Sequence, residues 1–154
     1  MSGAMFGTEI VSALLYRELS GIPAVTAAVG SRIHGLMVAP TAYTAPFLLF
    51  HPEQSAYPTE AIGRYDGEIT SETMRFAVRL ICAGEDTTPI RDAAIAQLDH
   101  FLSVGPIDFG WDGLPYQVTF TPLGEYPLTT LLDGGDISRQ LGTLYSIECL
   151  RGGA

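Results

Sequence analysis

The sequence predicts one α+β domain over residues 1–154, with a largely antiparallel sheet of about four strands and two main helices packed on one face. Three observations lead to this class. Apolar and polar residues alternate from Thr70 to Cys82, apolar residues then recur at helical spacing from Ile90 to Leu102, and a second alternating segment closes the chain from Leu141 to Leu150. A chain of 154 residues has the usual size of a single domain.

The segment from Thr70 to Cys82 is the centre of this prediction. Its period of two places an apolar row on one face of a pleated strand and a mostly polar row on the other. The apolar row is Met74, Phe76, Val78, Leu80 and Cys82, and the opposite row is Thr73, Arg75, Ala77, Arg79 and Ile81. Such a row needs a covering element, and the next segment supplies one.

An amphipathic helix is predicted directly after this strand. Thr88 is a candidate N-cap, and Pro89 suits the first helical position. The inward stripe is Ile90, Ala94, Leu98 and Phe101, with Ile95 and Leu102 beside it, and the residues expected to face water are Arg91, Asp92, Gln97 and Asp99.

The remaining segments follow from the same patterns. Helical segments are predicted from Thr8 to about Leu19 and over 23–29, extended segments over 32–34 and 47–50, and a hairpin from Phe109 to Thr121 around Asp112-Gly113. Loops are predicted over 52–67, 122–127 and 128–140, since these segments are rich in proline and glycine and lack apolar periodicity. We expect 52–67 and 128–140 to be arms that contact partners.

Composition excludes several classes of function. The net charge is −9, every basic residue is arginine, and no run of basic residues is present, which argues against binding to nucleic-acid backbones. No apolar run is long enough to span a membrane. Cys82 and Cys149 lie in apolar strand-like segments and are interpreted as buried free thiols, with a cross-strand disulfide as the alternative.

No motif indicates an enzyme, a metal or a cofactor. His34, His51 and His100 are isolated and have no metal-ligand spacing. The segment from Asp133 to Asp136 carries carboxylates on a glycine-rich loop, which suits a cation, but it lacks the further oxygen ligands of an EF-hand loop and is interpreted as a solvated turn.

A possible ligand cleft involves the predicted hairpin. Trp111 and Tyr116 lie near Asp108 and Asp112 in sequence, and either a cleft or aromatic pairing across the hairpin accounts for them.

Several segments together resemble the tail-completion, or tail-terminator, proteins of long-tailed bacteriophages. The matching segments are 13–19, 24–34 with Val29-Gly-Ser-Arg-Ile-His34, Ala39-Pro40, 46–50, the strand 75–82 and the helix 90–102. The chain departs from the family pattern at His34, where tyrosine is usual, and in its longer 52–67 and 122–140 segments.

The resemblance implies a structural protein of the virion, assembled in the host cytoplasm. Proteins of this family form rings, commonly of six identical subunits, that sit on the last ring of the tail tube, stop its growth and present a surface to the head-completion protein. Double-stranded DNA passes through the bore of such a ring without specific binding. Another ring of the neck, such as a head-completion protein or a tube-like subunit, is the alternative within this class, and a small ligand-binding domain or enzyme using the Trp111–Tyr116 hairpin is the alternative outside it.

A ring that lets DNA pass would benefit from acidic residues near its bore, because a basic wall binds DNA tightly. The candidates on turns and tips are Glu85, Asp86, Asp133 and Asp136. The alternative is that these carboxylates keep an outer surface soluble.

Overall fold

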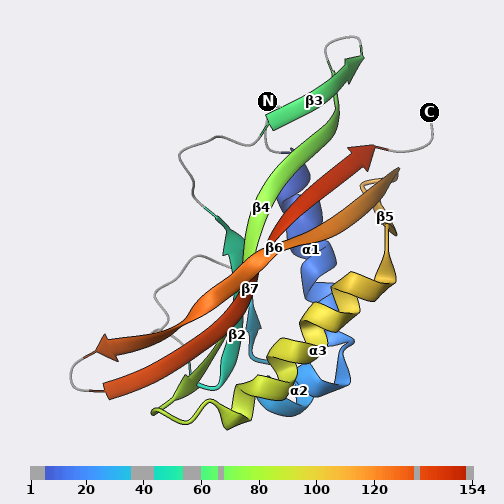
Figure 1. The fold of residues 1–154 in the computed structure, drawn as a ribbon. Helices are drawn as coiled ribbons and strands as arrows, with labels where there is room; N and C mark the ends of the chain where they lie inside the picture. The colour runs from blue at the N-terminus through green and yellow to red at the C-terminus, as the bar shows by residue number, and fades with distance from the viewer. Residues whose placement is uncertain (1–5, 36–43, 54–59, 66–67, 134–135, 152–154) are drawn as a thin grey trace.

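The computed structural model describes residues 6–35, 44–53, 60–65, 68–133 and 136–151. Within these ranges the chain forms three helices and a mixed sheet of seven strands, so the α+β class is confirmed (Figure 1). The helices are α1 (Phe6–Ser20), α2 (Pro23–Val29) and α3 (Thr88–Val104). The strands are β1 (Ile33–His34), β2 (Phe47–Pro52), β3 (Glu60–Tyr65), β4 (Glu68–Ala83), β5 (Ile107–Trp111), β6 (Leu114–Asp133) and β7 (Asp136–Arg151).

The sheet has the order β1-β2-β4-β7-β6-β5, and β3 pairs with the first part of β4. The pair β1–β2 is parallel, and the other strand pairs are antiparallel. The prediction of about four strands was therefore too low, because three of the seven are short pieces at the margins of a central set formed by β2, β4, β6 and β7. The prediction of two main helices omits α2, which has only seven residues.

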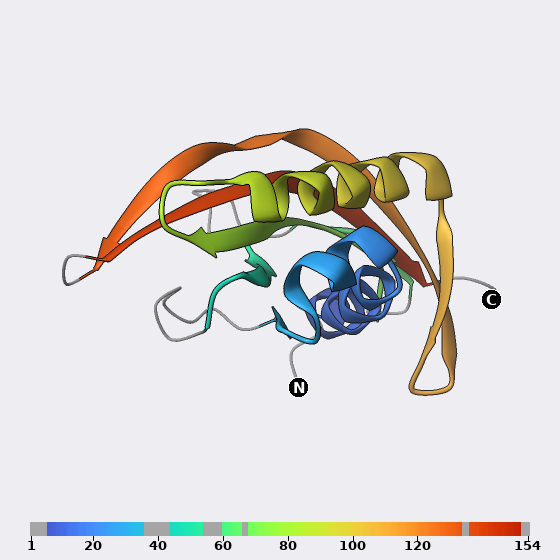
Figure 2. The ribbon, with the colours of Figure 1, turned by 90° about the horizontal axis from the view of Figure 1, so that it is seen from below.

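The three helices lie on one side of the sheet (Figure 2). One apolar cluster joins them to the sheet, and it contains the predicted inward row of β4 together with Tyr145, Ile147 and Cys149 of β7. The opposite face of the sheet holds a smaller cluster of Phe47, Leu49 and Ile81. The period of two in β4 and β7 is thus confirmed, as is the burial of Phe47–Phe50.

The orientation of α3 differs from the prediction. Its N-cap is Thr87 rather than Thr88, and its fully buried residues are Ile90, Ala93, Gln97 and Phe101. Gln97, which we expected to face water, is therefore a core residue, whereas Ile95 and Leu102 are exposed. Ala94 and Leu98 pack against the core but are only partly buried. Relative to the prediction, α3 is thus rotated about its own axis, and Gln97 forms hydrogen bonds with Thr143 and Tyr145 of β7 inside the core.

Three predicted loops contain strand residues. Residues 60–65 of the predicted 52–67 loop form β3, which pairs with β4; the remainder of that loop lies partly outside the described residues. The predicted break at 122–127 lies inside β6, which accommodates its prolines through two irregularities in its pairing with β7. The predicted loop 128–140 is the end of a long β6–β7 hairpin, in which Asp133 pairs with Asp136.

The predicted hairpin around Asp112-Gly113 is confirmed, because β5 and β6 pair from Trp111–Leu114 onward. Both turn residues have positive φ, 53° at Asp112 and 77° at Gly113. This is the backbone of a two-residue turn whose twist matches that of paired strands, and Asp-Gly adopts it readily.

Candidate functional site

The four predicted acidic residues come together at one end of the sheet. The pairing of β4 with β7 places Ala83 opposite Ser138, and the Gly84 amide donates a hydrogen bond to the Ile137 carbonyl at 2.7 Å. The β4–α3 turn therefore lies beside the tip of the β6–β7 hairpin (Figure 1, lower left). We call this region the acidic end; it comprises Glu85 and Asp86 on the turn and Asp133 and Asp136 at the tip.

The two turn residues of the acidic end have different local roles. Asp86 Oδ1 accepts hydrogen bonds from the Thr88 amide at 3.0 Å and the Thr88 hydroxyl at 2.6 Å. These bonds hold the pKa of the Asp86 carboxyl below its usual value, so it is ionised at the start of α3, where a negative charge is favourable. Glu85 is exposed and lies 3.8 Å from the Arg139 guanidinium. The backbone of Asp133 and Asp136 is described, and their side chains lie outside the described part of the chain.

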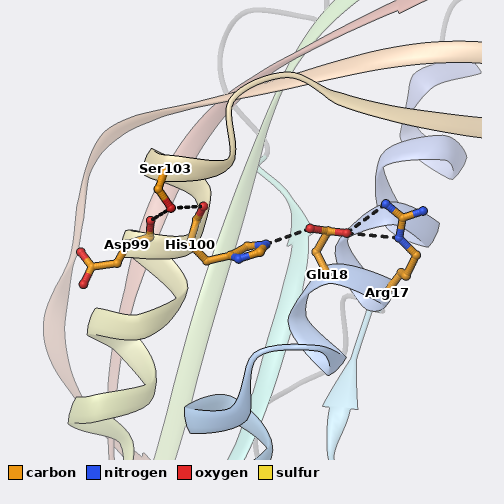
Figure 3. Close-up of polar contacts among 5 residues, drawn as sticks. All are labelled: Arg17, Glu18, Asp99, His100 and Ser103. Atoms are coloured by element: carbon orange, nitrogen blue, oxygen red, sulfur yellow. Dashed lines mark hydrogen bonds and ion pairs between the residues drawn. The ribbon is translucent and has the colours of Figure 1, made fainter.

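A polar bridge joins α1 to α3 on the helical face (Figure 3). Glu18 lies between His100, whose Nε2 is 2.8 Å from Glu18 Oε1, and Arg17, whose Nη2 is 2.9 Å from Glu18 Oε2. Burial raises the pKa of Glu18, but hydrogen bonds and charges from His100 and Arg17 outweigh it and hold that pKa below its usual value. The bridge thus favours an ionised Glu18 and fixes one flank of α3 against α1.

A buried carboxyl, that of Glu72 on β4, lies beside the start of α1. It was not among the residues predicted from the sequence. Glu72 on β4 is fully buried, and its Oε1 accepts a hydrogen bond from the Gly7 amide at 2.7 Å. Burial raises the pKa of Glu72, only partly offset by that bond. Gly7 leaves room for this bond, since a Cβ there would meet the end of the Met74 side chain and lie 3.0 Å from Glu72 Oε1. The only signal for this contact in the sequence is an acidic residue within a predicted strand.

The aromatic side chains of the predicted hairpin pack along it and against the core. Tyr116 is buried in the main core and pairs with Phe109, whereas Trp111 pairs with Leu114. Trp111 stacks on Phe109 with ring centroids 6.3 Å apart, and the Arg17 guanidinium lies 5.0 Å from the centre of the Phe109 ring. Aromatic packing along the hairpin therefore accounts for these side chains.

The two cysteines are the buried free thiols that we expected. Cys82 and Cys149 are free and buried, and pair with Arg139 and Glu72, at opposite ends of the β4–β7 ladder. Burial raises the pKa of the Cys149 thiol to about 12, which disfavours the reactive thiolate.

The histidines each have a local contact. His100 contacts Glu18, the His51 ring contacts Arg79 and the Pro52 carbonyl, and the His34 ring lies near Phe47. In the described part of the chain, no three His, Cys, Asp or Glu side chains form a group that could hold a metal ion. Likewise, among the helices that the structure describes, none has the length and apolar character needed to cross a bilayer.

Comparisons with known proteins add little to this description. No protein-family model matches the chain, and no curated protein matches it. One solved structure, whose name describes no activity, is similar with a TM-score of 0.46 and 18% sequence identity, over 90% of this chain and 94% of that chain. A likeness at this level carries no argument about function.

Proposed function

We propose that this chain is a tail terminator of a long-tailed bacteriophage. In this proposal it forms a homo-oligomeric ring, of six subunits, on the head-proximal end of the tail tube. The ring ends tube polymerisation and offers a surface to the head-completion protein. The protein is then a structural component of the virion and catalyses no reaction.

Two features support the proposal beside the sequence resemblance. The α+β fold retains the family's expected helix, strand and following helix as α1, β4 and α3. The β6–β7 hairpin and the β3–β4 pair extend toward opposite ends of the molecule (Figure 1), which suits a subunit that meets neighbours on several sides. Contacts between different surfaces of identical subunits close into a ring when the rotation permits.

The backbone pairing that brings the turn with Glu85 and Asp86 beside the strand ends at Asp133 and Asp136 is the observation that carries the proposed bore. Residues about fifty positions apart in the sequence meet there, with Arg139 as the cation in contact with Glu85. Charges repel passing DNA only within about 8–10 Å at physiological salt. In the proposed ring the acidic end therefore faces the bore.

Ring formation is tested with the purified chain and polymerising tail-tube subunits. Native mass spectrometry should show a closed oligomer of six, free or on the tube, and electron microscopy should show tubes that stop growing when the protein is added. A chain that stays monomeric both alone and with tube, and leaves tube length unchanged, would refute the proposal.

The bore is tested by charge reversal in assembled particles. Glu85→Lys combined with Asp133→Lys should leave assembly intact but slow genome ejection. Asp86 is left unchanged because it supports the start of α3. Glu9→Lys is the control for each single charge reversal, Glu85→Lys or Asp133→Lys, since Glu9 is exposed on α1 near Gly7, at the far end of the β4–β7 ladder from the acidic end. Ejection at the wild-type rate in the double variant would exclude the acidic end from the bore.

A further inference from the structure

The outward face of α3 carries large apolar side chains that the fold itself does not cover. Ile95 is 55% exposed and Leu102 is 60% exposed, and they lie seven residues apart on one side of the helix. Leu98, between them, is only partly buried. A single exposed apolar side chain is ordinary, but a strip along one helix indicates a contact surface.

Charged residues flank Ile95 in a symmetric pattern. Arg91, Ile95 and Asp99 follow one another at intervals of four residues, so they form one ridge along the helix surface. The cation is one turn before Ile95 and the carboxylate is one turn after it. Arg91 and Asp99 are both exposed. The Asp99 carboxylate points away from α1 and its polar bridge (Figure 3).

We propose that this ridge is a two-fold contact between two copies of the chain, with α3 packed antiparallel against α3. When such ridges of two helices interdigitate, the helix axes cross at about 50° and the ridges run parallel to each other. A two-fold axis at Ile95 then places Arg91 of each copy beside Asp99 of the other. The ridge is therefore complementary to itself, which is the property that a two-fold interface requires.

Charge complementarity identifies the second copy as the occupant. A partner that carried only apolar side chains would leave the Asp99 carboxylate without an opposite charge, whereas a second α3 supplies Arg91 at that end of the ridge. Within its own chain Arg91 lies near Asp86, which does not prevent a contact with Asp99 of another copy. The Arg91 guanidinium donates a hydrogen bond to Thr87 Oγ1 at 3.2 Å, but arginine has five N–H donors and can bind a carboxylate as well.

The proposed contact buries a small area, and the association is reversible. One helix crossing buries less than the roughly 1,200–2,000 Å² of a stable interface, so association is expected at high protein concentration only. The contact goes beyond the proposed function, because a two-fold contact joins pairs and does not propagate around a ring. If the chain forms rings, the same ridge joins two rings into a double particle.

Sedimentation equilibrium over a range of concentrations tests the proposal. At high concentration the wild-type particle should have twice the mass of the Ile95→Asp particle, whether the unit is a single chain or a ring. Arg91→Asp and Asp99→Arg should each weaken this doubling by about tenfold in association constant, and the double variant Arg91→Asp/Asp99→Arg should restore it because both pairs are re-formed with exchanged sign. A tenfold change corresponds to about 1.4 kcal/mol.

Glu9→Arg is the matched control, because it changes the net charge by the same amount as Asp99→Arg from an exposed position on α1. It should leave the doubling unchanged, and circular dichroism should show that every variant is folded. An unchanged doubling in Ile95→Asp, or two weakened single variants whose combination gives no recovery, would overturn the proposal. So would a wild-type protein that shows no doubling at millimolar concentration. Tube termination by Ile95→Asp is measured separately, since its retention or loss concerns the proposed function only.

Discussion

The buried side chain of Gln97 makes a sharp prediction about stability. Gln97 Nε2 donates hydrogen bonds to Thr143 Oγ1 at 2.8 Å and to the Ala94 carbonyl at 3.1 Å, and the Tyr145 hydroxyl donates to Gln97 Oε1 at 2.7 Å. Burial raises the pKa of the Tyr145 phenol well above its usual value, so it remains a neutral donor. These bonds connect α3 to β7 inside the core.

The change Gln97→Leu keeps similar volume but removes the amide. Thr143 and Tyr145 also interact with each other, so after the change one of these hydroxyls can still accept a hydrogen bond from the other. One buried donor then lacks an acceptor, and an unsatisfied buried group costs about 1–3 kcal/mol. The free energy of unfolding should fall by this amount.

Urea unfolding at neutral pH measures the effect. The triple variant Gln97→Leu/Thr143→Val/Tyr145→Phe should recover most of the loss, because apolar groups of similar shape then replace both side-chain partners of Gln97. Equal stability of Gln97→Leu and wild type, within about 0.5 kcal/mol, would contradict the account. A triple variant that is less stable than Gln97→Leu would mean that packing, not hydrogen bonding, dominates at this position.

Three further predictions concern stability. The folded-state pKa of Glu72 is raised, so its contribution to stability is fully present below the unfolded-state pKa of about 4.5 and is lost as pH rises through the folded-state pKa. When urea unfolding is repeated across pH, Glu72→Gln should lack this decline in the free energy of unfolding. The same pH dependence in wild type and Glu72→Gln would contradict this. Asp86→Ala should lower the thermal midpoint because α3 loses its capping carboxylate, whereas Glu85→Ala, on the same turn, should leave the midpoint nearly unchanged. Phe76→Ala should cost about 3–5 kcal/mol and Leu98→Ala clearly less, since only Phe76 is fully buried; equal losses in denaturant unfolding would contradict the orientation of α3 described above.

Local sequence patterns were sufficient to predict strand β4 and the β5–β6 turn. Alternation in β4 depends only on the geometry of an extended chain, so the sequence identified which residues face the helices. The turn at Asp112-Gly113 was equally local, because a two-residue turn with positive φ favours these residue types.

Longer-range pairing decided the features that were predicted wrongly. The segment 122–127 has the composition of a break, yet it continues as strand because β7 pairs with it on both sides of an irregularity. Gln97 has the composition of a surface residue, yet it is buried because Thr143 and Tyr145, almost fifty residues further along, satisfy its amide. No window of sequence contains both members of such a pair.

The candidate site divides in the same way. By itself the sequence determined the α+β class, the apolar faces of β4 and β7, and the presence of acidic residues on turns, because these depend on periodicity and on local backbone preference. Only the tertiary structure brought Glu85 and Asp86 beside the tip that carries Asp133 and Asp136, since that requires the β4–β7 register. Only the tertiary structure likewise left Ile95 exposed, because the rotation of α3 about its axis is set by the partners of its buried side chains.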